Sequence, residues 1–202
     1  AVIELVADPV SGIPGVTSIV SISVKDANTQ LPVSGSVVID GATVDIGADG
    51  TGSYEYAIVD GTSLSGTVLT GVFSSPDYED ATGDVTVTRE LIPTTTVVTP
   101  VTGSVGTTTT VTATVTASND RAVSQGKVTF YYDGNVIGVD DDLTDGVSIG
   151  VVFNSTISDG LITATYVDDS EGEAKIFDTS SSSTDISESG KTNIGKGQAV
   201  IE

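Results

Sequence analysis

The sequence predicts an all-β protein made of two tandem antiparallel β-sandwiches. Three observations support this architecture: a composition rich in Val, Thr, Ser, Gly and Asp, short stretches in which apolar and polar residues alternate, and turn residues that bound each stretch. Val and Thr fit the pleated surface of a strand, whereas Gly, Asp and Asn supply turns. No stretch sustains a 3.6-residue apolar period, so we expect almost no helix.

Seven strands are expected in the first half of the chain. The clearest covers 18–26, where Val20, Ile22 and Val24 share one face and the serines between them share the other. The remaining six strands are expected over 2–7, 34–40, 42–46, 53–58, 64–73 and 83–90. Gly, Pro, Asn or Asp bounds each strand, at the spacing that is typical of a β-sandwich.

The second half repeats this scheme with seven further strands. They are expected over 94–100, 108–117, 126–134, 135–140, 146–153, 160–168 and 173–178. In the stretch 108–117, every even-numbered position is threonine. Because side chains alternate between the two faces of a strand, we expect this threonine row to be the solvent face of a half-buried strand.

The two halves also resemble each other in sequence. Residues 23–35 (SVKDANTQLPVSG) align without gaps on residues 114–126 (TVTASNDRAVSQG), at an offset of 114 − 23 = 91. This internal repeat predicts two domains of similar construction, over 1–91 and 92–178. Pro93 lies at their boundary, where it removes a ladder donor and stiffens a short junction.

Residues 179–202 are expected to form a Ser/Thr/Asp-rich linker that leads into a further repeat. Its first part, TSSSSTDISESG (179–190), has few side chains that can pack in a core. If that part is ordered, we expect it to lie on a neighbouring surface or to pair with a strand edge. The last four residues, AVIE, are also the first four of the chain, which predicts one period of 199 − 1 = 198 residues from a tandem array.

Charge and composition exclude several classes of function. The net charge of 7 − 28 = −21 argues against binding to nucleic acid or to anionic lipid, both of which require basic residues. The chain lacks Cys and His, so disulfides, Cys/His metal sites and a histidine base are excluded. No apolar run approaches the roughly 20 residues of a membrane span, so none is expected in this segment.

A family resemblance appears in the first half. The stretch 7–39, ADPVSGIPGVTSIVSISVKDANTQLPVSGSVVI, resembles the opening of bacterial immunoglobulin-like domains of the invasin/intimin type. The matching residues are Ala7-Asp8-Pro9, Lys25-Asp26-Ala27-Asn28 and Pro32-Val33-Ser34-Gly35. Thr29 stands where that family usually has glycine, and Leu31 is an extra residue, so a longer turn is expected there.

The second half is similar to another prokaryotic immunoglobulin-like repeat. The matching residues are Gly126-Lys127-Val128-Thr129-Phe130, Asp133-Gly134, Ile137-Gly138 and Thr163-Ala164-Thr165-Tyr166. Together the two resemblances cover residues 3–178 and imply that both sandwiches are immunoglobulin-like. Such repeats occur in stalks of adhesins, in surface-layer or sheath proteins and in virion appendages, so the inference about function is by analogy.

Two acidic loops are candidate calcium sites, because clustered carboxylates supply the oxygen ligands that Ca²⁺ requires. Neither loop has EF-hand spacing: the first lacks the glycine at the sixth position, and in the second Val167 stands where the first ligand should be. The alternative is a pair of solvated acidic turns. We expect no required cofactor, with calcium as the one candidate ion. The candidate ligands are Asp140, Asp141, Asp142, Asp145, Asp168, Asp169 and Glu171.

Asn154 is a candidate glycosylation site. The triplet Asn154-Ser155-Thr156 matches the acceptor pattern and follows an expected strand at a turn. The alternative is an ordinary turn residue.

Catalysis is not expected. Carboxylate pairs alone would suffice for glycoside hydrolysis, but such sites need a cleft with aromatic platforms, and aromatic residues make up only 5% of this chain.

The sequence therefore favours a structural repeat unit of a long extracellular surface or filament protein, an adhesin-stalk type of spacer that acts mechanically. Its partners would be neighbouring copies of the repeat, with a host or surface receptor bound by other parts of the parent chain. One alternative is a self-assembling sheath, surface-layer, pilus-like or virion fibre subunit. A second is a glycan- or ice-binding module that uses the threonine row or exposed tyrosines, namely Tyr54 or Tyr56 together with Tyr131.

Overall fold

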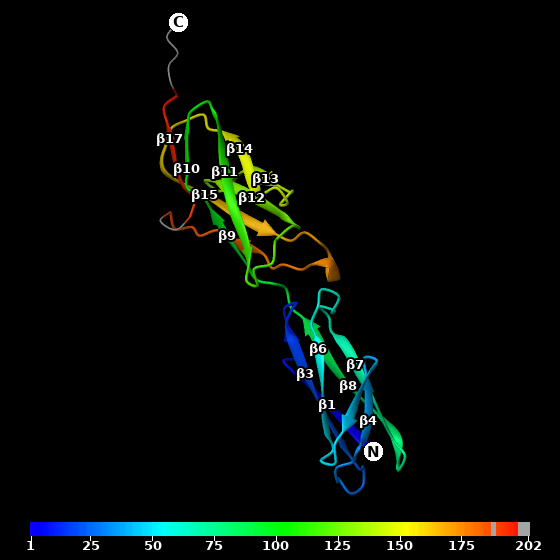
Figure 1. Ribbon diagram of the computed structural model, residues 1–202. Coiled ribbons are helices and arrows are strands. Elements are labelled where there is room, and N and C mark those ends of the chain that lie inside the picture. The colour runs from blue at the N-terminus through cyan, green and yellow to red at the C-terminus, as the bar shows by residue number, and fades with distance from the viewer. Residues whose placement is uncertain (187–188, 198–202) are drawn as a thin grey trace. The chain divides into compact units, whose positions relative to one another are not determined.

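The computed structural model describes residues 1–186 and 189–197, and the repeated AVIE at the end of the chain lies outside them. The chain divides into two compact units, Ala1–Glu90 (unit 1) and Leu91–Glu202 (unit 2) (Figure 1). Both are built from strands and turns, so the predicted fold class is confirmed. Over the described ranges, no helix has the length and hydropathy to cross a membrane.

Unit 1 is a sandwich of two sheets. One sheet has the strand order β1-β3-β6, and the other has the order β2-β8-β7-β4-β5. The strands are β1 (Val2–Asp8), β2 (Ser11–Gly12), β3 (Thr17–Lys25), β4 (Gly35–Ile39), β5 (Ala42–Ile46), β6 (Thr51–Ala57), β7 (Thr67–Ser75) and β8 (Tyr78–Arg89). β8 begins five residues earlier than the sequence predicts, because the β7–β8 hairpin continues as far as the pair Ser75–Tyr78.

Alternation decides which side chains form the core of unit 1. In β1, Ile3, Leu5 and Ala7 are buried while the residues between them are exposed. The antiparallel register places Ile3 opposite Val24 of β3. Such pairs on the inner faces bury apolar surface, which stabilises the fold by about 25 cal/mol per Å².

The two tyrosines of β6 both lie on the core side of their sheet. Tyr54 and Tyr56 are half-buried and pack against the core of unit 1. The expectation that one of them is exposed was wrong, because residues two apart in a strand share a face. Their hydroxyls bond locally, Tyr54 to Asp40 Oδ2 at 3.0 Å and Tyr56 with Thr62 Oγ1 at 3.2 Å.

Unit 2 repeats the topology of unit 1. Its sheets have the orders β14-β11-β9 and β10-β17-β15-β12-β13, with the short β16 also paired to β15 (Figure 1). The strands are β9 (Thr94–Val98), β10 (Val101–Ser104), β11 (Thr108–Ala117), β12 (Lys127–Tyr132), β13 (Asn135–Asp140), β14 (Val147–Val152), β15 (Ile157–Val167), β16 (Ser180–Ser181) and β17 (Lys191–Gly195). In this shared order, β17 takes the place that β8 holds in unit 1.

The threonine row of β11 lies where alternation predicts. Its even-numbered residues from Thr108 to Thr116 are exposed, while Thr109, Val111 and Ala113 point inward. The row is therefore the solvent face of this strand.

Two predictions near the C-terminus were wrong. The stretch 173–178 is not a strand: it begins within a 3₁₀ turn, Gly172–Ala174, and has a single bridge, between Phe177 and Ile92. Residues 179–202 are not simply a linker, because β16 and β17 belong to the sandwich and unit 2 extends past residue 178. Serine hydroxyls and backbone pairing attach most of this segment, with Ile194 as a buried apolar residue, which is why its composition resembles that of a linker.

Phe73 tests the core of unit 1, since it is fully buried in β7 whereas its neighbour Val72 is 41% exposed. We expect Phe73→Ala to lower the free energy of unfolding by about 3–5 kcal/mol, because the substitution removes buried contacts and leaves a cavity. The matched control, Val72→Ala, should change it by less than about 1 kcal/mol. Urea unfolding followed by circular dichroism would measure both, and equal effects would contradict the assigned faces.

Candidate functional site

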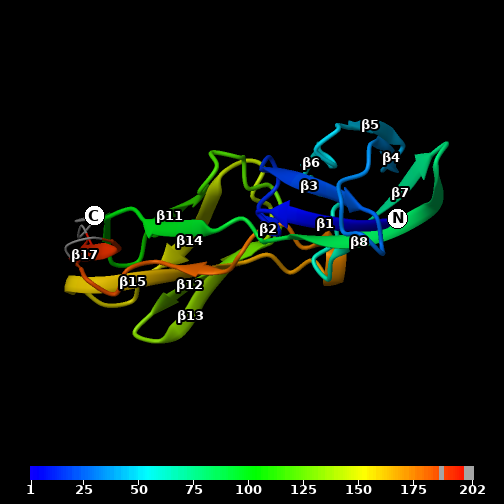
Figure 2. The same cartoon turned by 90° about the horizontal axis from the view of Figure 1, so that it is seen from below.

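The first strand of unit 1 switches sheets within a few residues. β1 pairs with β3, but after Pro9 the chain crosses to the other sheet, where β2 pairs in parallel with β8. Pro9 has no N–H to continue a ladder, and its carbonyl oxygen accepts a hydrogen bond from Ser18 Oγ at 2.7 Å. Figure 2 shows β2 beside the end of β8.

This parallel pairing joins the beginning of unit 1 to its end. Thr88 N donates to Val10 O at 2.9 Å and Glu90 N donates to Gly12 O at 2.8 Å. Ser11 Oγ donates to Glu90 Oε1 at 2.5 Å beside them. We call the pairing of β2 with β8, and its equivalent in unit 2, the terminal clamp of each unit.

Arg89 fixes the last residue of the clamp in unit 1. Its side chain is only 1% exposed, and its Nε donates to Thr62 O at 2.9 Å. Its backbone N–H donates to Ser63 O at 3.0 Å. The loop before β7 is therefore attached to the end of β8 through buried hydrogen bonds, which are costly to leave unmade.

The terminal clamp of unit 2 is the parallel pairing of β10 with β17. Its register runs from Val101–Thr192 to Ser104–Gly195, and Val105 N adds a hydrogen bond to Gly195 O at 3.0 Å. Val101, Thr192 and Ile194 are buried, whereas Thr102 and Gly195 are exposed.

Contacts between the same two segments of unit 2 continue on the N-terminal side of its clamp. Ile92 N donates to Ile176 O, and Asp178 N donates to Ile92 O, both at 2.9 Å. Thr94 Oγ1 donates to Ser180 Oγ at 2.7 Å. The first segment of unit 2 is thus attached to its last segment from Ile92 onward.

Ser189 and Gly190 extend this attachment toward β17. Val98 N donates to Ser189 Oγ, and Gly190 N donates to Val98 O, both at 2.9 Å. Gly190 has φ +71° and passes so close to Ile162 that a Cβ would overlap the Ile162 carbonyl oxygen. Only glycine fits at this crossing between the two sheets.

A short sequence signal marks both clamps, and the sequence analysis missed it. Pro9-Val10-Ser11-Gly12 recurs as Pro100-Val101-Thr102-Gly103, at the same offset of 100 − 9 = 91. In each unit, proline ends the first ladder and the next residues form the parallel strand. The recurrence could have predicted β2 and β10.

Asp168 fastens the loop that follows β15. Its side chain is 1% exposed and accepts hydrogen bonds from Gln125 Nε2 at 2.7 Å, Ile176 N at 2.9 Å, Phe177 N at 3.0 Å and Ser170 N at 3.1 Å. Burial by itself raises the pKa of Asp168, but the donated hydrogen bonds outweigh it and hold the pKa at about 2.

These bonds also explain the absence of a strand over 173–178. Two backbone donors of that stretch, those of Ile176 and Phe177, are bonded to the Asp168 carboxylate. Because both oxygens of Asp168 accept N–H groups, its geometry fits a structural role rather than that of a calcium ligand.

The other candidate calcium ligands lie on the surface. Asp140 accepts from the backbone of Ser148 at 2.7 Å, and Asp142 accepts from Thr144, whose hydroxyl and N–H lower the Asp142 pKa. Asp141 and Asp145 are exposed residues of the same loop.

In the second loop, Asp169 pairs with Lys127 at 3.4 Å, and Glu171 precedes the 3₁₀ turn. Within residues 1–186 and 189–197, no three acidic side chains converge as a metal site would require. Calcium binding at these loops stays a prediction.

The Asn154 triplet lies in the exposed loop between β14 and β15, where an attached glycan would meet solvent. Its glycosylation also stays a prediction.

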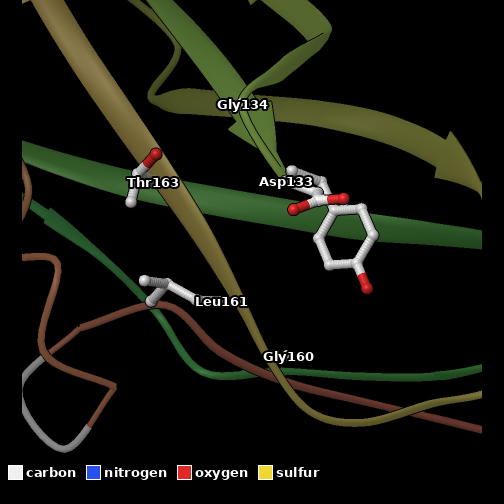
Figure 3. Close-up of a pocket in the computed structure, with 6 residues that line it drawn as sticks. Asp133, Gly134, Gly160, Leu161 and Thr163 are labelled. Carbon is white, nitrogen blue, oxygen red and sulfur yellow. The ribbon is translucent and has the colours of Figure 1, made fainter.

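A hollow of about 440 Å³ lies where the β12–β13 turn meets β15. Figure 3 shows Leu161 and Thr163 projecting from β15 and Asp133 at the turn. Tyr132 and the glycines at 134 and 160 complete the lining, so Asp133 contributes its single carboxylate. A glycosidase needs two.

One stretch, Gly146-Val147-Ser148-Ile149-Gly150, matches the Gly-x-Ser-x-Gly pattern of hydrolases. Ser148, however, lies within β14 rather than on a strand-to-helix turn, and the chain has no histidine to activate it. The match is therefore a coincidence of composition.

No protein-family model matches the chain, and no curated protein matches it. Similar solved structures include titin domains Z1Z2 in complex with telethonin, at 16% identity and a TM-score of 0.42, covering 93% of this chain and 92% of that one. The adhesin InvE of Yersinia pseudotuberculosis is similar at 16% identity and 0.35, covering 89% and 58%. The BSP domain of a biofilm-associated protein is similar at 16% and 0.29, covering 98% of this chain and 30% of that one. With all three TM-scores below 0.5, these likenesses carry no argument about function.

Asp168→Asn tests the loop attachment. The folded pKa of about 2 lies below the ordinary value of 3.8, so the carboxylate contributes stability that is present above about pH 4 and is lost as the pH falls toward 2. We expect Asp168→Asn to lower the free energy of unfolding at pH 7 by about 2 kcal/mol and to flatten its decline between pH 5 and 2.

Asp169→Asn is the matched control, because Asp169 is exposed and its ion pair is solvated. It should change the free energy of unfolding by less than about 1 kcal/mol. Chemical denaturation across this pH range is the measurement, and parallel pH profiles for wild type and Asp168→Asn would show that the role is misassigned.

Proposed function

We propose that this chain is a structural spacer that carries tension between its two ends, as a repeat unit of a long extracellular surface or filament protein. The observation that carries the proposal is the parallel pairing of the first-strand segment with the last strand in both units. Neighbouring copies of the repeat, and a receptor bound elsewhere on the parent chain, are the partners this function requires.

Parallel terminal strands resist tension for a geometric reason. When the start of the first strand and the end of the last are pulled in opposite directions, parallel neighbours must slide along each other. The ladder hydrogen bonds lie across this direction, so they are loaded together rather than in succession. A hairpin pulled open at its ends instead loses its bonds one at a time.

The extracellular setting is supported by the sequence resemblance over 7–39 to invasin/intimin-type domains and by composition. The excess of acidic residues keeps a β-rich surface soluble, and the absence of Cys and Met suits an oxidising environment.

Single-molecule force measurements on the whole chain test the spacer function. The chain has no cysteine, so handles can be attached at chosen positions. We expect unit 2 to resist a higher force when pulled through the chain ends than through Ser124→Cys and Asp141→Cys. These exposed positions lie at the open end of the β12–β13 hairpin, which would unzip pair by pair. Equal forces in the two geometries would contradict a load-bearing role.

A second candidate function, self-assembly through an edge strand, is favoured by β13. This strand ends its sheet and exposes Val136 (58%) and Val139 (51%), and an open apolar edge promotes pairing with another chain. If it operates, size-exclusion chromatography should show concentration-dependent oligomers that Val139→Lys abolishes. A monomer at all concentrations would remove this candidate.

A further inference from the structure

We propose that the two units yield in a fixed order under tension, with unit 1 opening before unit 2. The inference rests on the proposed spacer function and concerns which unit unfolds first when the tension becomes too high. Tension passes through the covalent chain in series, so both units experience the same force. The order in which they open therefore depends on the terminal clamp of each unit by itself.

The clamp of unit 1 is short. Its ladder has two residue pairs, Ser11–Thr88 and Gly12–Arg89. The Ser11–Glu90 hydrogen bond beside it lies at the surface, where water competes for both groups. The preceding strand, β1, belongs to the other sheet and pairs with β3, so the ladder to β8 begins only after Pro9.

The clamp of unit 2 is twice as long and is reinforced. Its ladder has four residue pairs, from Val101–Thr192 to Ser104–Gly195. Four further attachments connect the same two segments, at Ile92, at Thr94, at Thr96 and at Val98. Sliding the first segment past the last must break all of these together, because every attachment joins segments that run in the same direction.

Burial does not separate the two ladders. Each contains one pair in which both residues are buried, Gly12–Arg89 in unit 1 and Val101–Thr192 in unit 2. The difference between the clamps therefore lies in the number of attachments that must break together.

The last strand of unit 2 is interrupted, but the interruption is itself held in place. β8 is continuous over twelve residues, whereas its counterpart in unit 2 is divided into β16 and β17. Within the interruption, however, Ser182 exchanges two hydrogen bonds with Ala164, at 2.8 and 2.9 Å. Ser189 and Gly190 bond Val98, so the interruption is itself attached to both sheets.

The test is force spectroscopy of the whole chain with handles at its ends. When it unfolds, unit 1 (Ala1–Glu90) releases a shorter length of chain than unit 2 (Leu91–Glu202), because it has fewer residues. The 90 residues of unit 1 span at most about 320 Å when fully extended. A Gly/Ser insertion between Pro76 and Asp77, at the exposed tip of the β7–β8 hairpin, should lengthen the unit 1 step alone and identify it. We expect that step to come first in most traces.

An engineered disulfide provides a second test of the order of opening. Ser11→Cys with Thr88→Cys joins the two strands at a ladder pair, where the Cα separation suits a disulfide. Under oxidising conditions, the length released in the first step should shrink to that of the residues of unit 1 outside the 11–88 loop. Reduction of the disulfide should restore the full length. This variant strengthens the clamp, so the outcome does not depend on a destabilised fold.

The outcomes separate the two proposals. If unit 2 opens first, or if the order is random, the inference about order is overturned while the spacer function stands. If both units open at the low force of hairpin unzipping, the spacer function itself fails.

Discussion

The structure depends on one constraint: every buried backbone N–H and C=O group needs a hydrogen-bond partner. Pro9 and Pro100 cannot donate, so neither β1 nor β9 can continue along its first neighbour. The chain moves to the opposite sheet and meets the last strand of its own unit, which runs in the same direction. The parallel ladders follow from this displacement, and they close each sandwich between its first and last segments.

In unit 2, side-chain hydroxyls satisfy backbone N–H groups along the last segment, whereas in unit 1 regular strand pairing satisfies them. Where the last strand is interrupted, the hydroxyls of Ser182 and Ser189 take the places of backbone acceptors for Ala164 and Val98. Asp168 does the same for the backbone N–H groups of Ile176 and Phe177. A segment poor in apolar residues is thereby held in a defined path.

Alternation of side chains was enough to predict the long strands and the solvent face of β11. It could not identify β2 or β10, because two to four residues are too few to show a period. It also missed β17, whose attachment depends on the backbone and on Thr192 and Ile194 more than on an apolar pattern. The role of Asp168 depends on donors distant in sequence, which one sequence does not reveal.

The recurrence of proline at one offset also bears on how such repeats can vary in length. One residue added between Pro100 and Val101 would turn the side chains of β10 to the opposite face and move Val101 out of its buried position. The turn at Pro76 and Asp77 carries no such constraint, since it is exposed at a hairpin tip. Insertions and deletions among relatives should therefore accumulate at hairpin tips and avoid the four residues after each crossing.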